Sequence, residues 1–99
     1  MANKIQQLHA IVSGRVRGVN FRYYTEHKAN NLNLTGWVRK LPDGTVEVLA
    51  EGQRDELESL LEYLHKGSPA AQVETVDAEW KDATGTYADF RTTYASNAV

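Results

Sequence analysis

The sequence predicts an α+β protein in which two helices cover one face of a mainly antiparallel β-sheet. Segments with alternating apolar residues indicate strands, and two segments whose apolar residues recur every three to four positions indicate helices. Their order is strand, helix, strand, strand, helix, strand, followed by a short terminal strand. The chain has 99 residues, 41% hydrophobic and 24% charged, so we expect a single domain over residues 1–99 with an ordered core at about residues 6–94.

The first two elements are a strand and a helix. Residues 8–12 alternate with a period of two, which predicts the strand, and Ser13 and Gly14 end it. From Phe21 the spacing changes to that of a helix, which should end around residues 31–33. Its core-facing stripe is predicted to consist of Phe21, Tyr24, Ala29 and Leu32.

A hairpin and a second helix follow. The β-rich segments Thr35–Leu41 and Thr45–Ala50 are joined by Pro42, Asp43 and Gly44, which predicts an antiparallel hairpin. Four leucines at positions i, i+3, i+4 and i+7 predict the second helix. These are Leu57, Leu60, Leu61 and Leu64. Acidic residues near the helix start and basic residues near its end suit the helix dipole, and Gly67 terminates it.

The last elements are two strands. Residues 76–80 alternate in a fourth strand, and residues 88–92 suggest a short fifth. The complete order, βαββαβ plus a short terminal strand, is that of the ferredoxin-like two-layer sandwich. Because many unrelated functions share this fold, the function has to be inferred from a site.

Composition excludes several classes of function. A net charge of -2 disfavours nucleic-acid binding, and a chain without cysteine has no disulfide or thiolate metal site and suits a reducing cytoplasm. The histidines His9, His27 and His65 show no metal-ligand spacing. No apolar run approaches the ~20 residues needed to cross a membrane, and the polar start lacks a secretory signal. We therefore expect a cytoplasmic protein without metal, nucleic-acid or membrane partners. We also expect it to be a monomer, although composition does not bear on the oligomeric state.

The segment Gly14–Arg22 carries the strongest chemical signal. Its two glycines permit a curved loop between the first strand and the first helix. Successive backbone amides of this loop could point inward around an anion. Arg22 offers a planar set of donors for a tetrahedral oxyanion. The predicted phosphate-binding residues are Arg15, Val16, Arg17, Gly18, Val19, Asn20 and Arg22. The plainer alternative is that the glycines only form a turn and the arginines only solubilise the surface.

Lys40 lies near the end of the second predicted strand. Because a helical crossover joins the first and second strands, they should run parallel and end at the same edge of the sheet, beside the loop. Alternation places Lys40 on the helix-covered face and Trp37 and Arg39 on the other. The alternative interpretation is an ordinary solvated lysine beside a hairpin turn.

These residues resemble a known family. Gly14–Arg22 and Gly36–Glu47 look like the two signature motifs of the acylphosphatases, and the resemblance extends from Leu8 to Tyr94. It implies a hydrolase that cleaves small acyl phosphates to a carboxylate and inorganic phosphate by direct attack of water, without metal or organic cofactor. It also implies that Arg22 and the amides of residues 15–20 bind the phosphoryl group.

One position departs from the family pattern. Lys40 stands where the second signature has an asparagine that orients the attacking water. An amide oxygen can accept a hydrogen bond from water, whereas an ammonium group only donates. We therefore expect Lys40, as a catalytic residue, to make hydrolysis slower than an asparagine would. Asn20, in the loop, is another candidate for that role. Two alternatives stay open: a catalytically degenerate phosphate or acyl-phosphate binding module, and a single-stranded nucleic-acid binder, which the acidic charge disfavours.

Overall fold

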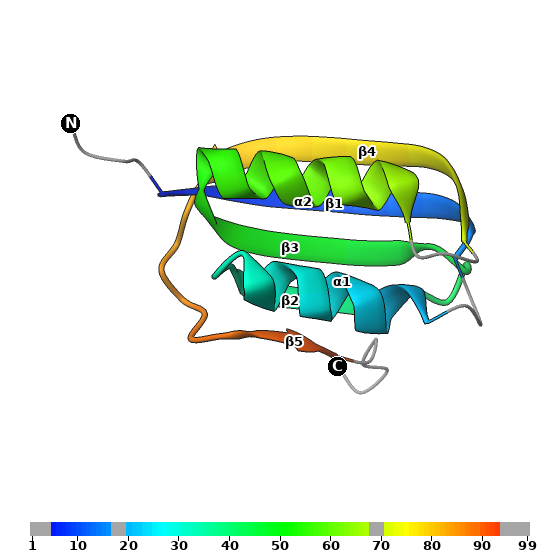
Figure 1. Cartoon of the computed structure of the whole chain (residues 1–99), viewed down its shortest axis with the longest axis horizontal. Coiled ribbons are helices and arrows are strands. Elements are labelled where there is room, and N and C mark those ends of the chain that lie inside the picture. The colour runs from blue at the N-terminus through cyan, green and yellow to red at the C-terminus, as the bar shows by residue number, and fades with distance from the viewer. Residues whose placement is uncertain (1–4, 17–19, 68–70, 94–99) are drawn as a thin grey trace.

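A computed structural model describes residues 5–16, 20–67 and 71–93 (Figure 1). The elements are β1 (Ile5–Arg15), α1 (Phe21–Asn31), β2 (Thr35–Lys40), β3 (Val46–Gln53), α2 (Arg54–Lys66), β4 (Gln72–Asp82) and β5 (Phe90–Thr92). The predicted order is confirmed. β1 and β4 extend beyond their predicted bounds because ladder pairing between the two strands continues through polar residues that the apolar alternation does not mark.

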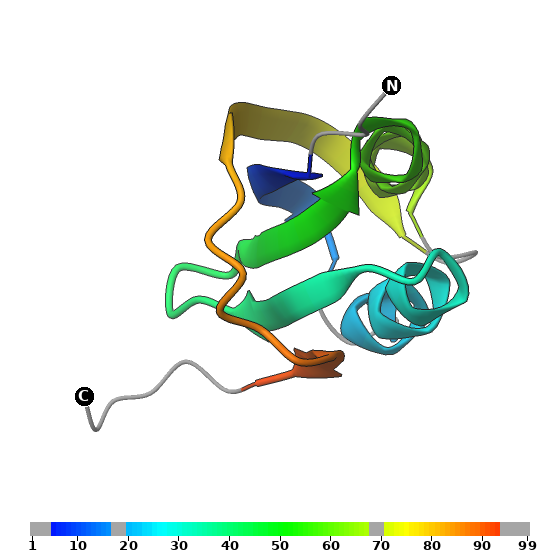
Figure 2. The ribbon, with the colours of Figure 1, turned by 90° about the vertical axis from the view of Figure 1, so that its left-hand side faces the viewer.

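The five strands form one sheet in the order β4-β1-β3-β2-β5. β1 pairs antiparallel with both β3 and β4, β2 pairs antiparallel with β3, and β5 joins β2 in parallel. Both helices lie on the same face of the sheet, which gives the two layers seen in Figure 2. The predicted ferredoxin-like sandwich with a mainly antiparallel sheet is therefore confirmed. Among the described residues, no helix has the length and apolar character needed to cross a membrane.

The core lies between the helices and the sheet. It is built from the inward residues of the strands and from one stripe of each helix. Its fully buried members include Leu8, Ala10, Val12, Val38, Val48, Ala50, Ala29, Leu57, Leu60 and Leu64.

One predicted core residue is wrong. Tyr24 is 39% exposed, and Thr25 takes the inward position with no exposed surface. The buried stripe of α1 is Phe21, Thr25 and Ala29, which follows the i, i+4, i+8 spacing of one helix face. Tyr24 lies on the flank toward α2, where it adds to the effect of burial in raising the pKa of Tyr63 to about 12.

Strand register brings the ends of β1 and β2 to the same end of the sheet. Val12 of β1 and Lys40 of β2 both pair with Val46 of β3, one from each side. α1 connects the two strands and therefore begins at this end of the sheet and runs back across it, as Figure 1 shows. We call this place, where β1 and β2 end and α1 begins, the crossover end.

The opposite end of the sheet is closed by the segment 83–89, which carries the chain from β4 to β5. Its anchor is Glu51 of β3, which is only 3% exposed. The Glu51 carboxylate accepts hydrogen bonds from Gln7 Nε2 (2.8 Å), from Thr84 N and Oγ1 (both 2.9 Å) and from Gly85 N (3.0 Å). This carboxylate therefore holds the segment that delivers β5 to its place beside β2.

We predict that Glu51→Gln destabilises the fold by about 1–3 kcal/mol at pH 7, because an amide presents a donor to neighbours that also donate. Burial alone would raise the pKa of Glu51, but the hydrogen bonds from Thr84, Gln7 and Gly85 outweigh it and hold the pKa below the ordinary 4.5. A carboxylate with a lowered pKa stabilises the fold above its ordinary pKa, and this contribution disappears as pH falls through the lowered value. The difference between wild type and variant should therefore shrink between pH 7 and an acid pH below this lowered pKa.

Urea unfolding at both pH values measures this difference. Glu58→Gln is the matched control, because Glu58 is exposed on α2 and pairs with Arg54 (2.8 Å), and such surface pairs contribute at most about 1 kcal/mol. Equal stabilities of the Glu51 and Glu58 variants at pH 7 would contradict the anchoring role.

Candidate active site

The crossover end begins with an irregularity in β1. The register against β4 shifts between Ser13 and Gly14, and Gly14 has φ +123°. A Cβ at this position would lie 2.3 Å from the carbonyl oxygen of Gln72, so only glycine lets the two strands approach this closely. The structure thus places Gly14 in the strand, where it accommodates β4, whereas the sequence interpretation gave it the role of curving the loop.

Val16 anchors the start of the loop. Its side chain is 3% exposed and belongs to the core, and its N–H donates to the carbonyl oxygen of Gly14 (3.0 Å). This predicted anion-binding amide is therefore already engaged with the strand. Arg15 is exposed beside it. Three other predicted phosphate-binding residues, Arg17, Gly18 and Val19, lie outside the described residues.

The start of α1 favours an anion. Asn20, the N-cap residue, adopts a left-handed conformation (φ 61°, ψ 27°), which asparagine tolerates better than most residues. Its side chain is exposed and makes no capping hydrogen bond, and the first turn contains no acidic residue. The positive end of the helix dipole is therefore neutralised neither by a capping side chain of Asn20 nor by an acidic residue of the first turn. The α1 terminus can offer its partial charge and its amides to an anion from outside.

Arg22 is the second residue of α1 and is half-buried. It shares a flank with Glu26, one turn later, because residues four apart lie on the same side of a helix. Glu26 accepts hydrogen bonds from Thr92 N and Thr92 Oγ1 (both 3.2 Å), so this flank faces β5 and its neighbour β2. α1 also packs directly on β2. Arg22 is thus on the flank of α1 that leads to the end of β2.

Lys40, the last residue of β2, is at that strand end. It pairs with Val46, whose side chain is in the core, and residues directly opposite each other in a sheet point to the same face. Lys40 is therefore on the helix-covered face, as predicted. Its side chain is exposed and makes no hydrogen bond or ion pair with any residue in the described part of the chain. Arg22 of α1 and Lys40 of β2 are thus both placed at the crossover end.

The other face of the sheet holds a separate polar cluster. The Glu47 carboxylate accepts a hydrogen bond from Arg39 Nε (2.7 Å) and is hydrogen-bonded to His9 Nε2 (2.7 Å). The Arg39 guanidinium lies 4.8 Å from the centre of the Trp37 ring. Burial would raise the pKa of Glu47, but the hydrogen bonds from His9 and Arg39 lower it below its ordinary value. Trp37 and Arg39 thus point away from the helices, as predicted.

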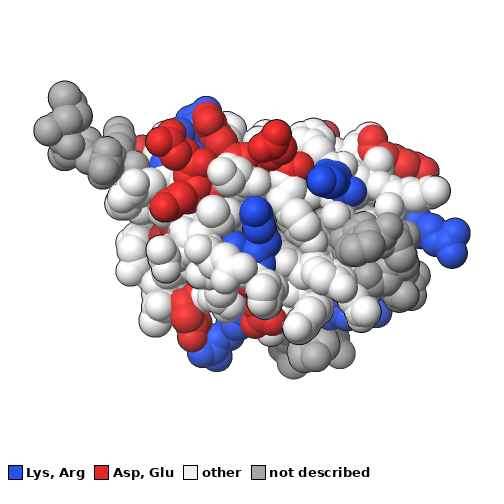
Figure 3. All heavy atoms as spheres, in the orientation of Figure 1, with Lys and Arg blue, Asp and Glu red and all other residues white. Residues whose placement is uncertain are grey.

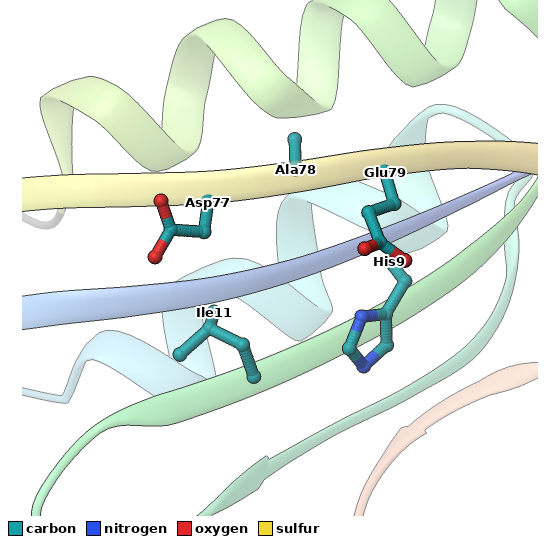
Figure 4. Close-up of a pocket in the computed structure, with 5 residues that line it drawn as sticks. All are labelled: His9, Ile11, Asp77, Ala78 and Glu79. Carbon is teal, nitrogen blue, oxygen red and sulfur yellow. The ribbon is translucent and has the colours of Figure 1, made fainter.

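His9 also lines a hollow of about 380 Å³ on this face (Figure 4). Its other lining residues are Ile11, Asp77, Ala78 and Glu79. Within the described ranges, no group of three or more histidine, aspartate or glutamate side chains is placed to hold a metal ion. His27 and His65 are exposed on their helices. None of the three histidines therefore joins Arg22 and Lys40.

Charge is distributed unevenly over the helical face. Figure 3 shows acidic side chains gathered over the beginning of α2, which is far from the crossover end. At the crossover end the same view shows basic side chains together with acidic ones on the side of β4, so the basic side chains there are the groups that would attract an anion.

Comparison with known proteins shows which family the chain belongs to. A family model described as Acylphosphatase matches residues 8–92. The chain belongs to the acylphosphatase family. An acylphosphatase of Marinobacter nauticus is 50% identical over 90 residues, which is 91% of this chain and 98% of the relative. One of Salinibacter ruber is 48% identical over 86 residues, 87% of this chain and 90% of the relative.

Solved structures of the family share the fold. The crystal structure of acylphosphatase from Bacillus subtilis superimposes with a TM-score of 0.87 at 37% identity, covering 90% of this chain and 99% of that one. The structure of an acylphosphatase from Coxiella burnetii gives 0.85 at 42% identity, covering 91% and 94%. The acylphosphatase resemblance of the two sequence motifs is therefore confirmed over nearly the whole chain.

Proposed function

We propose that this acylphosphatase-family protein hydrolyses small acyl phosphates to a carboxylate and inorganic phosphate, and that the crossover end is its active site. The observation that carries the proposal is the placement of Arg22 in the first turn of α1, at a helix start without acidic residues, on the flank that leads to the end of β2. A dianionic phosphoryl group suits both the guanidinium and the helix terminus. We further propose that the protein acts as a cytoplasmic monomer.

The proposed mechanism needs few groups. Arg22 holds the phosphoryl oxygens through its planar donors, assisted by the amides at the start of α1 and by those amides of residues 15–20 that are not engaged like that of Val16. Water attacks phosphorus in line, and the P–O bond to the acyl group breaks. Phosphoryl transfer depends mainly on positioning and on charge stabilisation. A carboxylate is a good leaving group, so the reaction requires no general acid, metal or organic cofactor.

Lys40 lowers the rate of acyl phosphate hydrolysis in this mechanism. Its ammonium can bind phosphoryl oxygens, but it cannot accept a hydrogen bond from the attacking water and so cannot orient the water lone pair toward phosphorus. Positioning of the nucleophile contributes more to catalysis than one additional exposed cation does. Asn20 offers an exposed amide at the same end of the sheet and is our second candidate for orienting the water.

A second candidate function follows from the same residue. With an exposed cation that pairs with no described residue at the crossover end, the domain would retain phosphate or acyl phosphate without turning it over. In that case it is a binding module on an acylphosphatase fold.

We predict that Arg22→Ala lowers the turnover of benzoyl phosphate by about 10³-fold or more and abolishes binding of inorganic phosphate, because the main charge partner of the phosphoryl group is lost. Turnover is measured by release of benzoate, and binding by calorimetry. Arg91→Ala is the control, because Arg91 is exposed on β5 and pairs with Asp89 (2.9 Å) away from the site. Retained binding or turnover in a folded Arg22→Ala protein would rule out this site.

We predict that Lys40→Asn raises turnover by about 10²-fold, because the amide oxygen supplies the missing acceptor. Lys40→Ala removes the cation without adding an acceptor and should give a much smaller rise. Steady-state kinetics on benzoyl phosphate compare the three proteins. A Lys40→Asn protein no faster than wild type would refute the acceptor argument, and an inactive wild type with an active Lys40→Asn variant would establish the binding-module alternative.

A further inference from the structure

Lys40 is a primary amine held beside the place where an activated acyl group is proposed to bind. Its strand end is fixed by pairing with Val46, its side chain is exposed on the helix-covered face, and it is unpaired within the described part of the chain. We propose that Lys40 is a site of self-acylation, at which the ε-amine takes the acyl group of an acyl phosphate bound at the crossover end. This proposal rests on the proposed function, because the phosphate group must first bind near Arg22.

The geometry brings the amine within reach of that ligand. Lys40 and Val12 flank Val46 on neighbouring strands, so the backbone of Lys40 is two strand spacings, about 10 Å, from that of β1. α1 begins at this end of the sheet and packs on β2, with Arg22 on the flank toward β2. A lysine side chain is a flexible four-carbon stem, so the amine can swing over the space between the end of β2 and the start of α1.

The acyl carbon of a bound acyl phosphate is one oxygen atom away from phosphorus. A phosphate held at Arg22 therefore fixes the carbonyl group within the space that Lys40 can sweep. Holding two reactants together raises their effective concentration and so accelerates their reaction relative to the same groups in free solution. A lysine elsewhere on the surface has no such advantage.

The reaction is balanced without another reactant. The nitrogen lone pair of the neutral amine attacks the carbonyl carbon, a C–N bond forms, and the C–O bond to phosphate breaks with its electron pair remaining on the phosphate oxygen. The proton released by nitrogen passes to phosphate or water. The products are Nε-acyl-lysine and inorganic phosphate. Hydrolysis, by contrast, breaks the P–O bond and releases the free carboxylate.

Other lysines in the chain provide internal controls. Lys28 is on α1, six residues after Arg22 and so about 9 Å further along the helix axis, where it lines a hollow between the two helices. Lys81 pairs with Gln7 at the opposite end of the sheet. Both can react with acyl phosphates from solution, but neither faces the crossover end. Any preference for Lys40 over these two therefore measures the contribution of the site.

The test is incubation of the full chain with benzoyl phosphate, followed by peptide mass spectrometry. We expect Lys40 to be benzoylated about tenfold or more above Lys28 and Lys81. Excess inorganic phosphate should reduce labelling of Lys40 to the level of the other two without changing theirs, because it displaces the bound reagent. Equal labelling of the three lysines, or labelling of Lys40 that phosphate does not reduce, would overturn the proposal.

Variants separate this proposal from the proposed function. Arg22→Ala should reduce labelling of Lys40 to the level of Lys28, whereas Arg91→Ala should not. Free benzoate, the product of hydrolysis alone, is measured in the same samples. Continued benzoate release with no preference for Lys40 overturns only the acylation, whereas benzoate release that survives Arg22→Ala overturns the proposed function. Phosphate competition on the wild-type protein keeps the test decisive if the Arg22 variant does not fold.

Discussion

The shared pairing of β1 and β2 with β3 is the constraint on which the site depends. Because Val12 and Lys40 flank the same residue, Val46, β1 and β2 both run to the same end of the sheet, and the helix that joins them must begin there. Phe21, only 1% exposed, fixes that helix start in the core. The topology of the sheet and helix therefore brings the arginine that follows Phe21 and the lysine that ends β2 to the same end of the molecule.

Stability and chemistry are placed at opposite ends of this sheet. The Glu51 carboxylate holds segment 83–89 at one end, and the described residues of the proposed site, Arg22 and Lys40, are at the other. The polar cluster of His9, Arg39 and Glu47 occupies the face that the helices leave open. Changes at the crossover end can thus alter binding and turnover while the anchor of the fold remains intact.

Much of this arrangement could be predicted from the sequence because periodicity reports burial directly. The alternation of β2 correctly put Lys40 on the helical face, but the same logic misplaced Tyr24, since a tyrosine at a flanking position reads as apolar while Thr25 does not. Glu51 gave no sequence signal, because a buried carboxylate is recognised only by its distant donors Gln7, Thr84 and Gly85. Gly14 was noticed as flexible, but its need for close approach to Gln72 depends on pairing with β4.

Binding and turnover both require one anion site where α1 begins. Titration of the ¹⁵N-labelled wild-type protein with inorganic phosphate, followed by amide chemical shifts, shows whether this site exists. We expect saturable shifts concentrated in Asn20–Tyr24 and at the end of β2 around Lys40, with none at His9 or Glu51. Shifts centred on the hollow between the helices around Lys28 and Tyr63, or no saturable shifts at all, would contradict it.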